Sequence, residues 1–279
     1  MTADASPVTG YPYLDAVLDP PGSVLAMAHR GGALHPEIPG IENTLHAFRH
    51  AVALGFRYLE TDVHATSDGV LVAFHDDALD RVTDSVGLLA KLTAAQISLA
   101  RIQGEHVVPT MAELLEEFPD CRFNIDLKSA AAVALLVDLL GRTAAHDRVC
   151  VGSFSRRRIR AFRRATGGRV ATSAAPSEVA AFRFGGVPAR RRHAAVLQVP
   201  WRHKSRRITV TTPALVRRAH RTGLHVHVWT GDERSQWVTI DDAGSFNELL
   251  DMGVDGLITD RTDLLKEVLI RRGQWRNDT

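Results

Sequence analysis

Cysteine and long apolar runs are scarce in this chain, and each shortage excludes a class of protein. The 279 residues include two cysteines, Cys121 and Cys150. A small domain held together by disulfides would need more of them. Both lie in apolar, strand-like runs, so we expect two reduced core thiols in a cytoplasmic protein, with a disulfide as the alternative. No apolar run approaches the roughly 18 residues that would span a bilayer.

The first 22 residues also lack the pattern of a signal peptide, because no positive stretch is followed by an apolar one. They contain four prolines and no lasting periodicity. This indicates an N-terminal tail over residues 1–22. No linker divides the remainder, and its length suits a single α/β barrel, which needs roughly 250 residues. We therefore expect one domain over residues 23–279.

Net charge is small, at +2, but the basic residues are unevenly distributed. Residues 151–210 hold fifteen Lys or Arg and one acid, Glu178, which gives a local net charge of +14. Such a segment is either an ordinary solvated surface or a weak contact for an anionic membrane. Aromatic residues do not interleave with the arginines, so nucleic acid is not an expected partner. The clusters are Arg156 to Arg158, Arg163-Arg164, Arg190 to Arg192 and Arg202 to Arg207.

Short β-rich runs alternate with longer amphipathic runs, which predicts βαβ units around a parallel sheet. The expected strands are 24–28, 57–63, 70–75, 122–127, 148–153, 169–173, 194–199, 224–229 and 255–259. The expected helices are 44–54, 110–118, 130–145, 155–166, 212–222, 245–252 and 262–272.

Nine strands are one too many for a regular eight-stranded barrel. Only a short turn containing Asp68-Gly69 separates the second and third runs, which predicts a hairpin there. The non-repeating region 79–109 is expected to cap the barrel mouth. An open doubly wound sheet would show the same alternation, but polar residues cluster at the ends of several strands, as in barrels. We predict a (β/α)₈ TIM-type barrel, irregular near its second and third strands.

Chemically useful side chains follow successive strands of this predicted barrel. Residues two apart on a strand share a face, so Glu60 points with Asp62, and Asp126 points with Lys128. If the first four strands are neighbours, these charges converge with others at the strand ends. Burying them without a counter-ion would be costly, and carboxylate oxygens suit a hard cation such as Mg²⁺ or Ca²⁺. The other converging residues are His29, Arg30 and His75.

The other histidines are interpreted as structural or solvated, because a lone histidine is more often either than a ligand. His64 is kept with them, although it shares a face with Asp62. The remainder are His35, His46, His50, His106, His146, His193, His203, His220, His225 and His227.

A series of ordered blocks extends over roughly residues 25–268. The first are His29-Arg30-Gly31, Glu42-Asn43-Thr44, Glu60-Thr61-Asp62, Thr66 to Gly69, and His75-Asp76 with Leu79, Arg81 and Thr83. The later ones are Val108 to Thr110, Asn124 to Lys128, Ser153-Phe154, Val228 to Thr230 and Gly253 to Asp260. Many blocks in the same order are far more specific than any single motif, and together they resemble the glycerophosphodiester phosphodiesterase family.

The resemblance implies roles for nine residues in the hydrolysis of glycerophosphodiesters to an alcohol and glycerol 3-phosphate. The divalent metal would be held by Glu60, Asp62 and Asp126, with Glu42 close to the site. The acid/base pair would be His29 and His75, the phosphate would be bound by Arg30 and Lys128, and Trp229 would form an apolar wall for the glycerol. The nucleophile would be either water or the neighbouring glycerol hydroxyl.

The sequence departs from the family pattern at three positions. Asp126 stands where the family usually has Glu, which is longer by one methylene, and related barrel phosphodiesterases use Asp there. Ile41 and Thr262 each replace a usual Pro, and both changes look structural.

Two other functions remain open at this stage. A sphingomyelinase D-like or lysophospholipase D-like enzyme would use the same residues on a lipid. It would need an apolar rim, for which the hints are Phe182, Phe184 and Trp201. A non-catalytic binding protein on this fold would have lost a histidine or two carboxylates, and none is lost.

Overall fold

The computed structural model describes residues 6–16, 23–185, 194–206, 208–231 and 234–275, and strands alternate with helices along them. The strands are β1 Leu25–His29, β2 Tyr58–Ala65, β3 Leu71–Ala73, β4 Arg122–Leu127, β5 Val149–Gly152, β6 Ala171–Thr172, β7 Val196–Pro200, β8 His225–Trp229 and β9 Gly256–Thr259. The α-helices are α1 Pro12–Asp15, α2 Leu45–Ala53, α3 Ala94–Ile97, α4 Met111–Glu117, α5 Ala132–Thr143, α6 Arg156–Ala165, α7 Pro176–Arg183, α8 Pro213–His220, α9 Ala243–Asp251 and α10 Thr262–Arg271.

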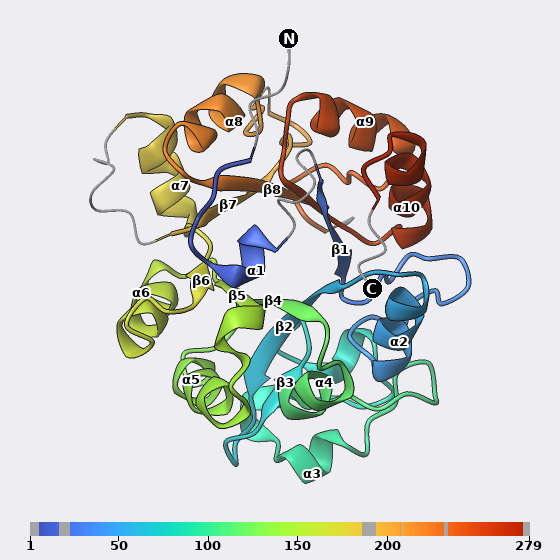
Figure 1. Cartoon of the computed structure of the whole chain (residues 1–279). Coiled ribbons are helices and arrows are strands. Elements are labelled where there is room, and N and C mark those ends of the chain that lie inside the picture. The colour runs from blue at the N-terminus through green and yellow to red at the C-terminus, as the bar shows by residue number, and fades with distance from the viewer. Residues whose placement is uncertain (1–5, 17–22, 186–193, 207, 232–233, 276–279) are drawn as a thin grey trace.

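Eight of the strands form a closed parallel barrel. Their order is β6-β5-β4-β2-β1-β9-β8-β7. The ends of this order meet through a parallel bridge between Ser173 and Val196, where the Ala174 N–H donates to the Val196 carbonyl at 2.9 Å. Helices surround the strands (Figure 1). The predicted TIM-type barrel is therefore confirmed.

The predicted irregularity beside the second strand is also confirmed. β3 pairs antiparallel with β2 and lies outside the barrel order. The hairpin closes where the Thr66 N–H donates to the Val70 carbonyl at 2.9 Å. Residues 79–109 contain α3 and two short 3₁₀ helices, Leu79–Arg81 and Leu89–Lys91. This insert shares a small apolar core with the loop after β1, through Ile38 and Ile41.

Alternation along the strands divides the buried residues between two layers. Outward-facing residues such as Leu59, Ile125 and Val151 pack against the helices in the main core. Burying a side chain of this size contributes roughly 1.5–3 kcal/mol, so this layer accounts for much of the stability. Residues on the other face of the strands, such as Met27 and Cys150, form a second cluster.

The N-terminal segment differs from the expected tail. Residues 12–15 form α1, and Tyr13 and Leu14 are fully buried in the second cluster. The Tyr58 hydroxyl donates to the Tyr13 carbonyl at 2.7 Å, and α1 lies over the middle of the barrel in Figure 1. Residues 1–5 and 17–22 lie outside the described residues, so the division at residue 22 stays a prediction.

Three further points concern the sequence predictions. The helix α7 was not expected, although Pro176 at its first turn and Glu178 bonding back to the Ala175 N–H are start signals. Cys121 and Cys150 are both free and buried, as expected. Among the described residues, no helix is long and apolar enough to cross a membrane.

Candidate active site

Strand register brings the predicted site residues to one end of the barrel. His29 on β1 lies opposite Glu60 on β2, and Asp62 lies opposite Asp126 on β4. His29 and Asp126 lie at or near the carboxyl ends of β1 and β4, and the register brings Glu60 and Asp62 of the longer strand β2 beside them. Lys128 follows β4, and its backbone N–H donates to the Val63 carbonyl at 3.1 Å. The expected convergence of these residues is therefore present.

The turn after β1 places Arg30 within this group. Arg30 has a φ of 50°, a left-handed conformation that is uncommon outside glycine. Gly31 has a φ of 89°, and a Cβ there would lie 2.6 Å from the Cβ of Ala47 on α2. Gly31 therefore lets this turn approach α2 closely, and Gly32, where a Cβ would lie 2.8 Å from Thr262, lets it approach the start of α10. The turn directs the backbone N–H of Arg30 to Glu60, at 3.1 Å.

Two cations and three carboxylates form the centre of the site. Lys128 Nζ lies 2.9 Å from Asp62 Oδ1 and 2.8 Å from Asp126 Oδ2. Arg30 Nε lies 3.4 Å from Asp62 Oδ2. Burial opposes ionisation of Asp62, but the charges of Lys128 and Arg30 outweigh it and lower the pKa of Asp62. Burial and the charge of Asp62 raise the pKa of Glu60 to about 7.

The oxygen atoms of this centre fit a hard cation. Asp62 Oδ2 and Asp126 Oδ1 are buried and have no hydrogen-bond partner among the described residues. Buried polar atoms normally have partners, so each such exception needs an explanation. If one carboxylate oxygen is taken from each of Glu60, Asp62 and Asp126, the three oxygens do not all lie within 4.8 Å of one another. Lys128 Nζ bridges the two aspartates instead.

His29 is held by a carboxylate from the neighbouring strand. Its Nδ1 lies 2.9 Å from Oδ1 of Asp260, which directly follows β9, and its Nε2 lies 3.8 Å from Glu60 Oε2. Burial is the largest single effect and lowers the pKa of His29, but the charges of Asp260 and Glu60 and the hydrogen bond to Asp260 together outweigh it and raise the pKa to about 9.

His75 has a carboxylate partner of its own. Its Nδ1 lies 2.6 Å from Asp76 Oδ1, and Arg81 Nε donates to Asp76 Oδ2, also at 2.6 Å. Burial is the main cause of a lowered pKa for His75, and the charges of Arg30 and Lys128 act in the same direction. Both predicted acid/base histidines thus have Nδ1 beside a carboxylate, which leaves Nε2 for proton transfer.

Glu42 lies beside this centre and is bound by two arginines. Its carboxylate accepts hydrogen bonds from Arg81 at 2.8 Å and from Arg30 at 3.3 Å. These contacts hold the Arg30 side chain at the site. Direct ligation of a metal by Glu42 stays a prediction.

An apolar wall borders the cations. The ring of Trp229 lies 5.9 Å from the ring of Phe154 and 6.4 Å from that of Trp237. Lys128 Nζ lies 5.8 Å from the Phe154 ring centre. Trp229 therefore lies where the wall was expected, and Phe154, which is 61 % exposed, extends it towards solvent.

Sequence reasoning did not assign roles to several residues that shape this site. Asp260, Asp76 and Arg81 each stand inside a block that carried the family resemblance, which was the available signal. Asn124 was also missed. It is buried on β4, two residues before Asp126, and it accepts a hydrogen bond from Gln198 at 2.6 Å.

Other side chains expected at a surface or rim are buried. Phe182 and Trp201 lie in the main core, so these two hints of a lipid-binding rim were wrong, whereas Phe184 is 83 % exposed. Arg163 is buried and bonds Glu178 at 2.9 Å, so it does not contribute to the basic surface. His193, Arg207 and the cluster Arg190 to Arg192 lie outside the described residues.

The interpretation of the other histidines is supported for three of them by burial. His64 contacts the carbonyl of His75 at 3.2 Å, and burial lowers its pKa. His225 and His227 are fully buried on β8. His35 and His50 differ from these three histidines, because they meet Glu37 in a cluster of their own.

Comparison with known proteins gives concordant matches. A model of the glycerophosphoryl diester phosphodiesterase family matches residues 29–264. "Probable glycerophosphodiester phosphodiesterase 2" of Mycobacterium tuberculosis is 40 % identical over 261 residues, which cover 91 % of this chain and 94 % of that protein.

Solved structures share the fold at lower identity. A glycerophosphodiester phosphodiesterase from Parabacteroides distasonis has a TM-score of 0.71 and 22 % identity, over 90 % of this chain and 99 % of that chain. A phosphodiesterase from Oleispira antarctica, in complex with the product sn-glycerol-3-phosphate, has a TM-score of 0.70 and 22 % identity, over 89 % and 97 %.

Proposed function

The chain belongs to the glycerophosphoryl diester phosphodiesterase family and is a phosphoric diester hydrolase, and from this premise we propose that it hydrolyses glycerophosphodiesters to an alcohol and glycerol 3-phosphate. One observation carries the proposal: His29, two cations and three carboxylates meet on three adjacent strands, and His75, which follows β3, is close enough to respond to the charges of Asp62, Arg30 and Lys128. A phosphodiester anion requires charge neutralisation, activation of a nucleophile and protonation of a leaving alkoxide, and this set offers groups for each.

A divalent cation, Mg²⁺ or Ca²⁺, would be held by Glu60, Asp62 and Asp126. The oxygen donors suit such an ion, and it is supported by Asp126 Oδ1, which has no hydrogen-bond partner among the described residues, and by Asp62 Oδ2, which has none beyond the 3.4 Å ion pair with Arg30 Nε. When bound, the ion supplies positive charge beside a phosphoryl oxygen. The shorter Asp126 is compatible with this role, since it lies opposite Asp62 in the strand register.

Arg30 and Lys128 bind the phosphate in this proposal. Both are largely buried, and Arg30 Nε has no hydrogen-bond partner among the described residues. Charge-assisted hydrogen bonds to phosphate oxygens would satisfy these donors. Trp229 and Phe154 would then contact the apolar face of the glycerol.

His29 and His75 exchange protons with the nucleophile and the leaving oxygen. Asp260 and Asp76 hold their Nδ1 atoms at 2.9 and 2.6 Å, which orients each Nε2. If the neighbouring glycerol hydroxyl is the nucleophile, a cyclic phosphate forms first and is then opened by water. If water attacks directly, no cyclic product accumulates, so product analysis distinguishes the two routes.

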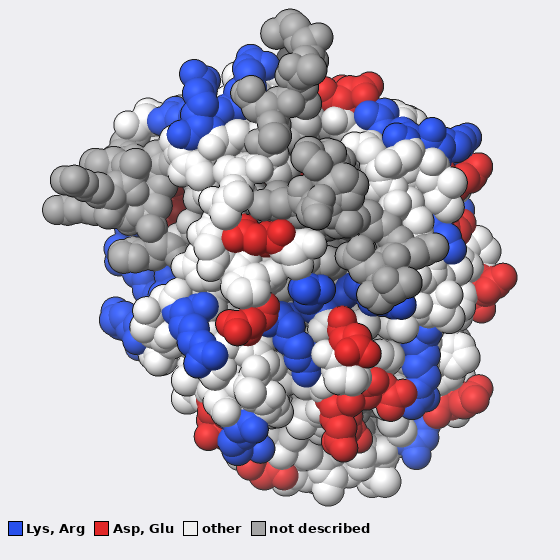
Figure 2. All heavy atoms as spheres, in the orientation of Figure 1, with Lys and Arg blue, Asp and Glu red and all other residues white. Residues whose placement is uncertain are grey.

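A second candidate is a lysophospholipase D-like or sphingomyelinase D-like activity at the same centre. It is favoured by the exposed Phe154, which lies two residues before the start of the basic helix α6. In Figure 2, Lys and Arg side chains gather where α6 lies. Arg156, Arg157, Arg160 and Arg164 of this helix line a cavity at the surface. This surface would contact anionic lipid weakly.

A substrate screen tests both candidates. Purified protein would be incubated with glycerophosphodiesters and lysophospholipids in Mg²⁺, Ca²⁺ or Mn²⁺, and the products identified. The proposal expects glycerol 3-phosphate from a glycerophosphodiester. Release of lysophosphatidic acid alone would favour the lipid candidate, and no turnover of any diester would contradict both.

A further inference from the structure

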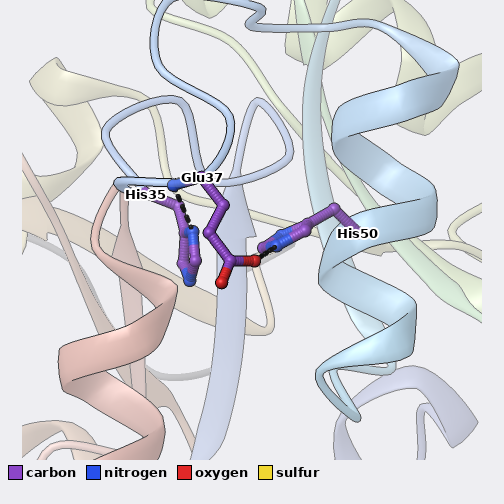
Figure 3. Close-up of side chains that lie close together, drawn as sticks. All are labelled: His35, Glu37 and His50. Carbon is purple, nitrogen blue, oxygen red and sulfur yellow. Dashed lines mark hydrogen bonds and ion pairs between the residues drawn. The ribbon is translucent and has the colours of Figure 1, made fainter.

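A second group of ligand-type side chains lies in the loop between β1 and α2. His35 and Glu37 belong to this loop, and His50 projects towards it from α2 (Figure 3). One ligand atom from each of the three lies within 4.8 Å of the other two, and among the described residues this is the one trio of its kind. The Glu37 carboxylate lies between the two rings, with Oε2 3.0 Å from His50 Nε2.

An ordinary surface ion pair does not explain this arrangement fully. The two imidazole rings lie 4.3 Å apart, and His35 is only 6 % exposed. His50 Nδ1 is buried and has no hydrogen-bond partner among the described residues. Two imidazoles packed against each other are unfavourable if both are protonated, whereas a shared cation accommodates both in their neutral form.

The donor set selects the kind of ion. Two imidazole nitrogens and one carboxylate oxygen suit Zn²⁺ and similar borderline metals, while Mg²⁺ and Ca²⁺ prefer oxygen ligands alone. Three protein ligands leave a fourth tetrahedral position for water. We propose that His35, Glu37 and His50 form a Zn²⁺-binding site that fixes the β1–α2 loop onto α2.

The loop that this site would fix connects it to the active site. Arg30 lies at the start of the loop and Glu42 near its end, and the two side chains meet at 3.3 Å. Between them, Ile38 packs into the core of the insert. At present His35 Nδ1 accepts a hydrogen bond from the Glu37 backbone N–H at 3.2 Å. Since this bond occupies Nδ1, Nε2 of His35 is the ring nitrogen left to bind zinc.

Zinc titration calorimetry tests the proposal independently of turnover. The protein is first saturated with Mg²⁺ so that the carboxylate centre is occupied, and Zn²⁺ is then added to wild type, Glu37→Gln and His50→Gln. Each variant should bind Zn²⁺ more than about 10-fold more weakly, because even changes behind a metal ligand cost 10–100-fold. Glu37 is highly exposed, so Glu37→Gln should fold normally.

His46→Gln is the matched control. His46 lies one turn before His50 on α2 and its ring lies 5.0 Å from that of His106, with no carboxylate in the pair. Its zinc affinity should equal that of wild type. Asp126→Asn, in the active site, should also keep the affinity.

The melting temperature gives a second readout. At Zn²⁺ concentrations of 100 times the dissociation constant, wild type should melt roughly 5 °C higher or more, and Glu37→Gln should show little shift. Equal zinc binding by wild type, Glu37→Gln and His50→Gln would overturn the proposal. So would loss of binding in His46→Gln or Asp126→Asn instead.

Discussion

Asp260 gives a sharp test of how the structure prepares His29 for proton transfer. Its Oδ1 lies 2.9 Å from His29 Nδ1, and both side chains are about nine-tenths buried. Asp260→Asn keeps the shape of the side chain but removes its charge. The new amide can also present an N–H to His29 Nδ1, which favours the tautomer of His29 that carries its proton on Nε2 instead of Nδ1. A hydrogen bond to a charged group contributes about 1.5–3 kcal/mol, so its full loss in the transition state would lower kcat by roughly 10–150-fold.

The control is a second buried pair of the same kind at a distance from the site. Asp255, which precedes β9, has Oδ2 2.9 Å from His220 Nε2 and is also buried. Asp255→Asn should lower the free energy of unfolding but leave kcat unchanged. Steady-state kinetics on a glycerophosphodiester would measure both variants. The positioning role of Asp260 would be refuted if Asp260→Asn kept a wild-type kcat, or if it changed only KM.

Three further predictions concern the metal, the basic surface and acid stability. Exhaustive chelation with EDTA should abolish turnover and Mg²⁺ or Ca²⁺ should restore it; full activity of protein shown to be metal-free by elemental analysis would rule out the requirement. Binding to anionic vesicles should fall as salt rises, since charges are screened within about 8–10 Å at physiological ionic strength. The double variant Arg156→Ser, Arg160→Ser should bind the vesicles more weakly. If the protein does not sediment with vesicles even at low salt, the basic residues form an ordinary solvated surface. Burial lowers the pKa of His227 to about 3. Below its unfolded pKa of about 6.5 only the unfolded state takes up this proton, so stability should fall by a few kcal/mol between about pH 6.5 and pH 3. His227→Leu should reduce this loss, and identical urea midpoints of the two proteins at every pH would contradict it.

Much of the barrel could be predicted because hydrophobic alternation reports directly on strands and helices. All nine strands occur at the predicted places, and the Asp68-Gly69 turn located the hairpin. The rule that residues two apart share a face also placed Glu60 with Asp62 and Asp126 with Lys128. These are local relations along one strand, which a sequence displays.

Contacts between distant segments could not be predicted in the same way. Asp260 reaches His29 across 231 positions, and only the closure of β1 against β9 brings them together. The four-residue helix α1 has too few hydrogen bonds to form alone and depends on burial of Tyr13. Nothing in the sequence around Phe182 and Trp201 distinguishes a position in the core from one at the rim of the site.

The most direct test of the acid–base mechanism measures kcat for His29→Ala and His75→Ala on two substrates, the natural diester and a p-nitrophenyl diester. On the natural diester each variant should lose about 10²–10⁴-fold, while His64→Ala should lose far less. The p-nitrophenyl leaving group departs without a proton, so it should rescue the variant that lacks the acid and not the one that lacks the base. Wild-type turnover of the natural diester by both His29→Ala and His75→Ala would contradict the mechanism.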